Sequence, residues 1–248
     1  MKTIKIMENI PEDIKKETKK GVGWRNLFNW IALLGFFYGE LDERLTLRLA
    51  LQKILKKPVP KGLTIWGCFG GISFFLFIIQ VITGIMLLMY YRPTIDQAYD
   101  SIVHITNNVP YGWLMRGIHY WASNLMVLTL FIHLLKVFFS AAYKPPRDLN
   151  WVVGVSLFSL TLAFGFTGYL LPWTQLSYWA TVVGTEIAGA IPLIGDTLKI
   201  LARGGEGVGQ LTLTRFFALH VAILPWIFIF LLIPHFIMIR RLGISEPL

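Results

Sequence analysis

Four of the five histidines lie inside long apolar segments, and their type and spacing make them the residues best suited to chemistry. His119 and His133 are 14 residues apart in one segment, and His220 and His235 are 15 apart in another. Ionisable side chains are costly within lipid, so an intramembrane histidine is a functional candidate. A lone histidine is more often a packed, hydrogen-bonded residue, whereas two matched pairs favour the binding of a ligand.

Helical geometry places the two histidines of each segment on a shared face. With about 3.6 residues per turn and a rise of about 1.5 Å, His119 and His133 differ by about 40° in rotation and about 21 Å in height. His220 and His235 differ by about 60° and about 22 Å. The second segment contains two prolines, Pro225 and Pro234. A kink at a proline can absorb the extra residue of the longer interval.

Four stretches are long and apolar enough to cross a bilayer, which requires about 20 apolar residues in a helix. They are roughly 64–91, 113–139, 151–172 and 212–240. Only 15% of the residues are charged and 55% are hydrophobic, whereas soluble domains carry about 25% charged residues. The predicted fold class is therefore all-α, an integral membrane four-helix bundle.

The two histidine-bearing spans run in the same direction, because one span separates them. His119 then faces His220 at one depth. His133 faces His235 at the other depth. Each pair can supply two axial imidazole nitrogens to one flat macrocycle held between helices. Zinc is the alternative, but two-histidine sites with no Cys, Asp or Glu nearby are poor zinc sites. The sequence thus predicts two haems stacked across the bilayer.

Glycines in the other two spans repeat this interval. Gly70 and Gly84 are 14 residues apart, as are Gly154 and Gly168. A helix can approach the face or edge of a wide, flat cofactor only where a side chain is absent. Glycine is also common in helix packing within membranes, but two pairs at the same interval favour a two-level cofactor site. Two haems at two depths form an electron path, which points to redox chemistry with a lipid-soluble quinol.

The basic residues indicate orientation rather than a nucleic-acid partner, although the net charge is +9. Of the 23 Lys and Arg residues, 18 fall on the side with both termini and the loop between the second and third spans. The positive-inside rule makes that side cytoplasmic. Residues 1–62 are predicted to form an N-terminal extension with an amphipathic interfacial segment, without a cleavable signal peptide. Residues 63–248 form the four-span domain. Two short apolar patches, 178–183 and 187–194, predict a helical surface hairpin between the last two spans.

Four motifs carry a family resemblance. They are Gly-Trp-Leu-Met-Arg-Gly-Ile-His at 112–119, Gly-Phe-Thr-Gly-Tyr-Leu-Leu-Pro-Trp at 165–173, Leu-Thr-Arg-Phe-Phe-Ala-Leu-His at 213–220 and His-Phe-Ile-Met-Ile-Arg at 235–240. These motifs resemble those of the cytochrome b family over about residues 36–248. The 15-residue interval in the last span is similar to that of the cytochrome b6 branch, the N-terminal half of a split cytochrome b.

The resemblance implies a di-haem b subunit of a quinol–cytochrome c (or plastocyanin-type acceptor) oxidoreductase. Electrons would pass from quinol oxidation through the His119/His220 haem and then the His133/His235 haem to a negative-side quinone site, with proton translocation. The Pro-Glu-Trp-Tyr motif of the family's quinol-oxidation site is absent from these 248 residues. The expected partners are therefore a subunit IV-like protein that carries this motif, a Rieske iron–sulfur protein and a c-type cytochrome, in a dimeric complex. The chain is expected to be inactive alone.

Two departures from plant-type chains favour a bacterial cytoplasmic membrane. Tyr120 follows His119 where plant-type chains have Arg, and the extension at roughly 1–30 is longer. An alternative function is a b-type anchor that links the quinone pool to a multihaem cytochrome without a Rieske protein. A transporter or scaffold with no redox role is a further alternative, which a reduced-minus-oxidised spectrum would distinguish.

Two arginines are candidates for binding haem propionates. Arg116 lies one turn before His119, so both share a face, and its guanidinium can pair bidentately with a carboxylate. The alternative is an interfacial arginine whose charge reaches water. Arg240 follows His235 by five residues and is interpreted in the same way. Two other charges, Lys136 and Arg147, are interpreted as topology signals, and His104 as a surface residue.

Cys68 is the only cysteine. Without a Cys-x-x-Cys-His motif, ordinary c-type haem attachment is excluded, and composition alone favours a small buried hydrophobic residue. The run Cys68-Phe69-Gly70-Gly71, however, resembles the Cys-x-Gly-Gly setting in which b6-type proteins carry an extra haem c through a single thioether bond. The resemblance therefore predicts one covalently attached haem c at Cys68, on the negative side.

Overall fold

The structure is a computed structural model that describes residues 65–243. Across that range all regular secondary structure is helical. Within residues 65–243, four segments are long and apolar enough to cross a membrane. They are Ile65–Leu88, Gly112–Phe139, Asp148–Leu170 and Gln210–Leu242. Each predicted boundary lies within three residues of these bounds, so the predicted four-span all-α fold is confirmed. The predicted extension at 1–62 lies outside the described residues.

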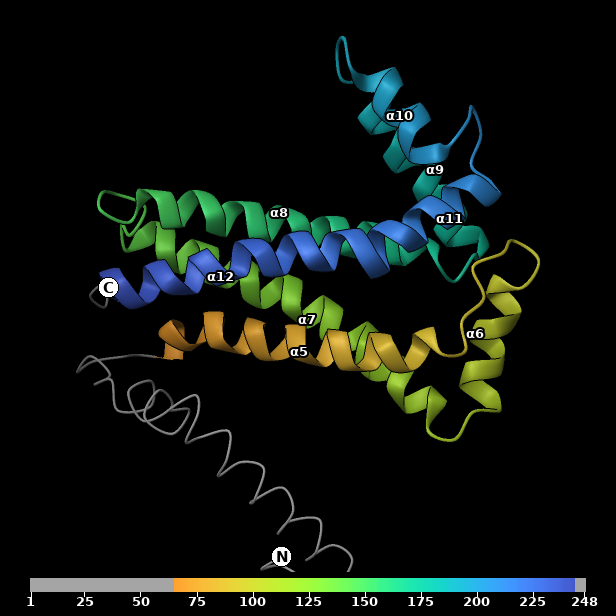
Figure 1. Ribbon diagram of the computed structural model, residues 1–248, viewed down its shortest axis with the longest axis horizontal. Coiled ribbons are helices and arrows are strands. Elements are labelled where there is room, and N and C mark those ends of the chain that lie inside the picture. Colours follow the sequence, from red (N-terminus) through yellow and green to blue (C-terminus); the bar gives the residue numbers. More distant parts are fainter. Residues whose placement is uncertain (1–64, 244–248) are drawn as a thin grey trace, which may run out of the picture. The chain divides into compact units, whose positions relative to one another are not determined.

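The four spans pack as a bundle of two close pairs (Figure 1). The first span is a short 3-10 helix, η1 (Ile65–Cys68), followed by α5 (Phe69–Leu88), and it lies along α7 (Gly112–Phe139). The third span, α8 (Asp148–Leu170), lies along the last span, which comprises α11 (Gln210–Ala218), the π-helical turn η2 (Leu219–Ile223) and α12 (Leu224–Leu242). Contacts between α7 and α8 join the two pairs.

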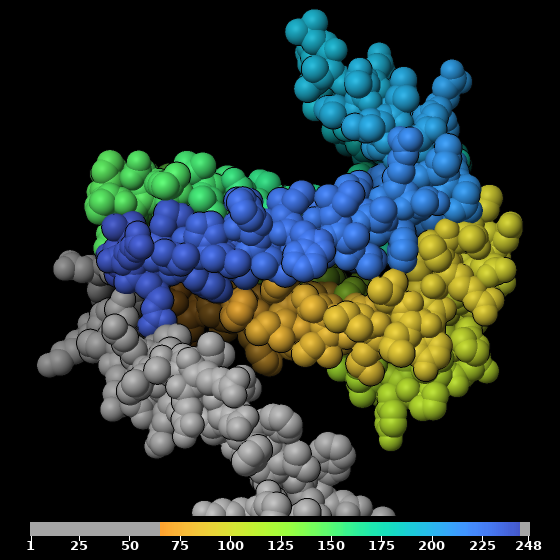
Figure 2. Space-filling view, in the orientation of Figure 1, coloured from red at the N-terminus to blue at the C-terminus, as the bar shows by residue number. Residues whose placement is uncertain are grey.

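An apolar cluster holds the middle of the bundle together. It combines buried residues from all four spans, Leu76, Phe77, Ala122, Met126, Leu157 and Phe228. The rings of Phe77 and Phe228 lie 4.5 Å apart between centroids. Phe77 is seven residues from both Gly70 and Gly84, so the cluster separates two levels of the bundle. Figure 2 shows the surfaces of α5 and α12 lying side by side along the bundle.

One end of the bundle carries three further helices, α6 (Ala98–Asn107), α9 (Gln175–Gly189) and α10 (Gly195–Arg203). We refer to it as the α6 end; the opposite end carries the α7–α8 loop. The helix α6 was not predicted. It is closely packed against the start of α7, where a Cβ atom at Gly112 would lie 1.9 Å from the Ile105 carbonyl oxygen. His104 is exposed on α6, as expected of a surface residue.

The predicted helical hairpin between the last two spans is present, with one difference. The first patch, 178–183, lies within α9, but the second, 187–194, ends α9 and forms the turn before α10. Glycine at position 195 permits the close turn there, since a Cβ atom at Gly195 would lie 2.1 Å from the Gly189 carbonyl oxygen. Figure 1 shows the hairpin projecting from the α6 end. Its placement on the membrane surface stays a prediction.

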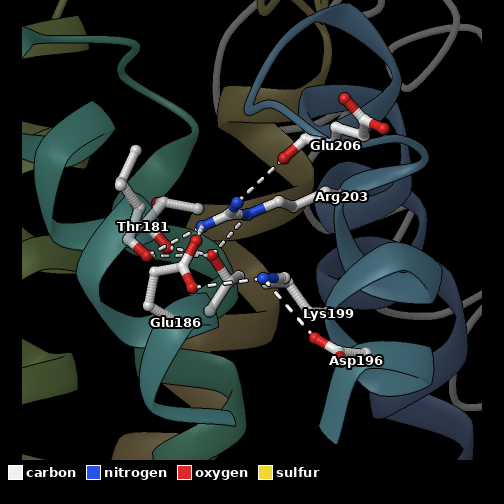
Figure 3. Close-up of polar contacts among 8 residues, drawn as sticks. Thr181, Glu186, Asp196, Lys199, Arg203 and Glu206 are labelled. Atoms are coloured by element: carbon white, nitrogen blue, oxygen red, sulfur yellow. Dashed lines mark hydrogen bonds and ion pairs between the residues drawn. The ribbon is translucent and has the colours of Figure 1, made fainter. Parts of the chain in front are cut away.

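Arg203 joins the two helices of the hairpin and is only 5% exposed (Figure 3). Its guanidinium donates to Thr185 Oγ1 at 2.7 Å and to the carbonyl oxygen of Val182 at 3.0 Å, and it pairs with Glu186 at 2.9 Å. Lys199 also reaches Glu186, at 3.2 Å. The hydrogen bond from Lys199, with a second from Arg203, lowers the pKa of the Glu186 carboxyl. The buried residues of α9 and α10 are polar or glycine. The charge network around Arg203 therefore joins the two helices of the hairpin.

Candidate functional site

His119 on α7 and His220 on η2 face one another, and we refer to them as the first pair. Their ring centroids lie 6.5 Å apart, with the ring planes inclined by 71°. Two imidazole nitrogens bound on opposite sides of one metal ion, each at about 2.0 Å, are about 4 Å apart. The ring centroids lie behind those nitrogens, so the distance between the centroids must be larger than the distance between the nitrogens. The first pair therefore has the spacing of two axial ligands to one metal.

Hydrogen bonds define the tautomer of both rings in the first pair. His119 Nδ1 lies 2.8 Å from Thr83 Oγ1, whose own hydrogen is donated at 2.7 Å to a carbonyl one turn earlier in α5. His220 Nδ1 lies 3.1 Å from the Phe164 carbonyl oxygen and 3.2 Å from Thr167 Oγ1. The Phe164 carbonyl oxygen can only accept, so His220 Nδ1 carries the proton. The Thr83 hydroxyl uses its one hydrogen for the Ile79 carbonyl oxygen, so it accepts from His119 Nδ1. Nε2 of each ring is then free to bind a metal.

His133 on α7 and His235 on α12 form the second pair, at the other level. Their Nδ1 atoms are buried and have no partner of hydrogen-bonding geometry among residues 65–243. The backbone of Asn150 interacts with His235, but more loosely than a hydrogen bond of ordinary geometry. Nearby, the rings of Phe74 and Phe236 meet edge to face with centroids 5.1 Å apart, which joins α5 to α12. The second pair thus lacks the side-chain hydroxyls that bond to the rings of the first pair.

The four predicted glycines each face one of the four histidine rings. The distances from an ideal Cβ atom to the facing Cε1 atom are 3.0 Å for Gly70–His133, 3.4 Å for Gly84–His119, 3.4 Å for Gly154–His235 and 2.6 Å for Gly168–His220. Sequence reasoning expected these glycines to make room for the cofactor. The structure places an imidazole ring directly against each one, where α5 and α8 pack behind the histidine-bearing spans, and their contact with a cofactor stays a prediction. The glycines therefore allow the rings to be held between helices.

The extra residue of the longer histidine interval is absorbed by the π-helical turn η2, not by a proline kink. The Leu224 N–H bonds to the Leu219 carbonyl oxygen, five residues earlier. Pro225 follows directly and has no N–H to continue the α-helical pattern, which favours such a turn. Pro234 lies within α12, which continues to Leu242. The turn brings His220 level with His119 although the interval is 15 residues.

The predicted arginines and Cys68 lie near the two ends of the bundle. Arg116 is at the α6 end, 3.4 Å from Thr106 Oγ1, and lines a cavity of about 200 Å³ together with Tyr99 and Thr174. Cys68 is exposed at the opposite end, two residues before Gly70. Arg240 is in the last turn of α12, also at that end.

Sequence reasoning missed two polar residues at the start of α8. Arg147 Nε and Asn150 Oδ1 are buried without a hydrogen-bond partner in the described part of the chain. The sequence alone interprets Arg147 as a topology charge only. Asn150 lies one turn before Gly154, which contacts His235, so Asn150 lies close to the level of the second pair. The four-residue spacing from Gly154 is the signal that identifies this shared face.

The donor sets fit haem better than zinc. No group of three or more His, Cys, Asp or Glu residues gathers between residues 65 and 243. The first pair therefore offers two facing imidazole rings, as a bis-histidine haem requires, and the second level offers two further histidines within the same helical bundle. This arrangement defines the class: a four-span helical membrane protein with two stacked histidine pairs.

Comparison with known proteins gives the family. The family described as Cytochrome b/b6/petB matches residues 54–243. Cytochrome b6 of Synechococcus elongatus is 46% identical over 211 residues, which cover 85% of this chain and 98% of the relative. Cytochrome b6 of Cyanidium caldarium is 44% identical over 212 residues, 86% of this chain and 99% of the relative. The chain belongs to the cytochrome b/b6 family.

A solved structure supports the same assignment. A chain described as "Hyperthermophilic respiratory Complex III" matches with a TM-score of 0.78 and 35% sequence identity. The match covers 84% of this chain and 56% of that chain. The present chain therefore spans slightly more than half of the solved chain.

Proposed function

We propose that this chain is the di-haem b subunit of a quinol-oxidising electron-transfer complex and carries electrons across the membrane. The observation that carries the proposal is the first pair, whose facing rings lie 6.5 Å apart with Nδ1 protonated on both. At the other level, Gly70 and Gly154 lie against the rings of the second pair in the same way as Gly84 and Gly168 lie against those of the first. Bound haem iron supplies one-electron redox chemistry, and two levels provide a path between the membrane faces.

In this proposal the chain's own residues hold and orient two haem b groups. His119 and His220 bind the positive-side iron, and His133 and His235 bind the negative-side iron. Gly70, Gly84, Gly154 and Gly168 let α5 and α8 close on the imidazole rings. Arg116 and Arg240 pair with haem propionates at the two ends, since a guanidinium matches a carboxylate bidentately. The apolar cluster around Phe77 keeps water from the space between the levels.

We also propose a third, covalently attached haem c at Cys68. Its exposed thiol lies at the end of the bundle nearest the second pair, and Gly70 and Gly71 follow it directly. A Cβ atom at Gly71 would have no neighbour within 4 Å among the described residues. A flat group attached to Cys68 therefore has an open glycine surface beside it. This haem would lie between the second pair and an arriving quinone.

The proposed reaction requires other subunits. The family's Pro-Glu-Trp-Tyr motif does not occur in these 248 residues, and the proposal assigns it to a partner. A subunit IV-like protein would supply the motif and complete a quinol-oxidation site beside the α9–α10 hairpin. A Rieske iron–sulfur protein would take one electron and pass it to a c-type cytochrome. The other electron would cross this chain to a negative-side quinone site, coupled to proton translocation.

The proposed location is a bacterial cytoplasmic membrane, with both termini on the cytoplasmic side and the complex dimeric. Each end of the described bundle carries five basic residues, so the proposed orientation depends on the other 13, which all precede residue 63 in the sequence and would be held on the side of the α7–α8 loop. Cysteine accessibility to a membrane-impermeant reagent can test it, with Cys68 replaced by Ser throughout. Lys144, in the α7–α8 loop, and Asn108, after α6, are both exposed. Lys144→Cys should react only in inside-out vesicles and Asn108→Cys only in right-side-out cells, and the reverse labelling would overturn the orientation.

The decisive experiment is purification with and without partners. The chain with haem alone should not reduce cytochrome c rapidly with quinol, whereas the co-purified complex should. Fast turnover by the isolated chain would contradict the proposal that a second subunit completes the site. A Rieske protein among the co-purified subunits supports this function, and a multihaem cytochrome without a Rieske protein supports the alternative membrane anchor.

A further inference from the structure

The two histidine pairs differ in the residue that precedes each facing glycine. At the first pair both glycines follow a threonine, in Thr83-Gly84 and Thr167-Gly168. At the second pair the corresponding residues are apolar, Phe69 before Gly70 and Val153 before Gly154. Thr83 and Thr167 are buried, 4% and 6% exposed. Each places its hydroxyl oxygen within hydrogen-bond distance of a histidine Nδ1 atom.

Both hydroxyls are arranged to accept a hydrogen bond from the imidazole rather than to donate one. Thr83 Oγ1 donates to the Ile79 carbonyl oxygen at 2.7 Å, and Thr167 Oγ1 donates to the Ala163 carbonyl oxygen at 2.8 Å. A hydroxyl has one hydrogen, so each oxygen is left with lone pairs for an Nδ1–H group. Their burial strengthens this interaction, because the surroundings have a low dielectric constant.

A hydrogen bond accepted from Nδ1–H makes the imidazole a stronger donor through Nε2. A stronger axial donor stabilises the ferric form of a haem more than the ferrous form and so lowers its reduction potential. The second pair lacks such a hydroxyl, and its Nδ1 atoms have no partner of hydrogen-bonding geometry in residues 65–243. The looser interaction with the Asn150 backbone involves only the His235 ring of the second pair.

We propose that Thr83 and Thr167 are positioning residues that hold the potential of the positive-side haem below that of the negative-side haem. The inference rests on the proposed function, since it requires haem at both pairs. It goes further by assigning the direction of electron flow to two hydroxyl groups. An electron that enters at the first pair then moves downhill to the second pair.

The two threonines are not equivalent. Thr83 is the one hydrogen-bond acceptor described for His119 Nδ1, whereas His220 Nδ1 also bonds to the Phe164 carbonyl oxygen. Loss of the Thr83 hydroxyl therefore leaves His119 Nδ1 without an acceptor, while His220 keeps one after loss of Thr167. Thr83→Val should raise the potential of the first haem more than Thr167→Val does.

The test is the midpoint potential of each haem, measured by spectroelectrochemistry in the purified complex. Thr83→Val should shift the electron-transfer equilibrium between the two haems by up to about tenfold, which for a one-electron couple corresponds to about 59 mV. The second haem should keep its potential. Thr161→Val is the matched control. Thr161 is buried and lies on α8 like Thr167, but its hydroxyl donates only to the Leu157 carbonyl oxygen.

The reciprocal variant is Val153→Thr, which places a hydroxyl one residue before Gly154 and should lower the potential of the second haem. If Thr83→Val fails to assemble, Thr83→Ser should retain the wild-type potential, and Val153→Thr still decides the question. Unchanged potentials in Thr83→Val and Val153→Thr, with both haems bound, would overturn the inference and leave the proposed function intact. Absence of haem from the unmodified complex would instead overturn the proposed function itself.

Discussion

The first and second histidine pairs share a scaffold and differ in what surrounds the imidazole rings. At both levels a glycine of α5 and a glycine of α8 lie against the rings. Only the first pair has threonine hydroxyls on Nδ1 and a π-helical turn at one ligand. Only the second pair has a cysteine nearby and buried polar groups at the start of α8. The glycine positions therefore repeat at both levels, whereas the side chains around each pair of rings differ.

The largest expected effect comes from removing one ligand at each level. His119→Leu should lose the first haem and keep the second, and His133→Leu should do the reverse. In the proposed function each haem would depend on its own two nitrogens, since the apolar cluster separates the levels. Pyridine haemochrome analysis should find two non-covalent haems in the parent and one in each variant. His104→Leu, an exposed position on α6, should retain both. Loss of both haems from a helical, monodisperse variant would contradict independent sites.

Cys68 sharpens the comparison, because the first pair has no equivalent thiol. A thioether bond survives denaturation, whereas haem held by two histidines does not. We expect haem staining at the chain's mass of 28.3 kDa on a denaturing gel and its loss in Cys68→Ser. Both b haems should remain in the variant. The spectrum should lose a high-spin component, because the sequence has no fifth intramembrane histidine to serve as a second strong axial ligand. A stained band that persists in Cys68→Ser would remove the thioether from the proposal.

A substitution in the apolar cluster between the two levels measures how much that cluster stabilises the bundle. Phe228 is 4% exposed and contacts both Phe77 and Phe164. Phe228→Ala should destabilise the protein by about 3 kcal/mol, the low end for such a cavity, because the surrounding lipid is also apolar. Thermal unfolding in detergent measures the loss. Phe230→Ala is the control, since Phe230 is 75% exposed and should change stability little. An equal loss in both variants would refute the packing argument.

The smallest expected effect distinguishes tight from loose glycines. An added Cβ atom would lie 2.6 Å from His220 at Gly168 but 3.4 Å from His235 at Gly154. Gly168→Ala must displace the ring and should cost about 1–3 kcal/mol by overpacking, together with lower occupancy of the first haem. Gly154→Ala makes only ordinary contact and should cost less. Gly165→Ala is the control on the same helix, because its added Cβ atom meets no described residue within 4 Å. Haem-to-protein ratios and unfolding temperatures provide both measurements.

Much of the fold could be predicted because the spans depend on local composition. A bilayer requires long apolar helices, so all four spans were placed within three residues of their bounds. The helix α6 was missed because it is short and only partly apolar. Its position depends on the close contact between Ile105 and Gly112, which has no signature in the local pattern. The second helix of the hairpin was misplaced for a similar reason, since the turn before α10 depends on the close approach of Gly195 to the Gly189 carbonyl oxygen.

By itself the sequence determined that the chain has four spans and two levels of paired histidines, because helical periodicity converts residue intervals into depth and facing direction. Only the tertiary structure decided which atoms surround each ring. The glycines were found by their interval, but their contact with imidazole depends on how α5 and α8 pack behind α7 and α12. The π-helical turn and the threonine hydroxyls likewise depend on the register between neighbouring helices. Register is set by side-chain packing across the whole bundle, and no local interval in the sequence encodes it.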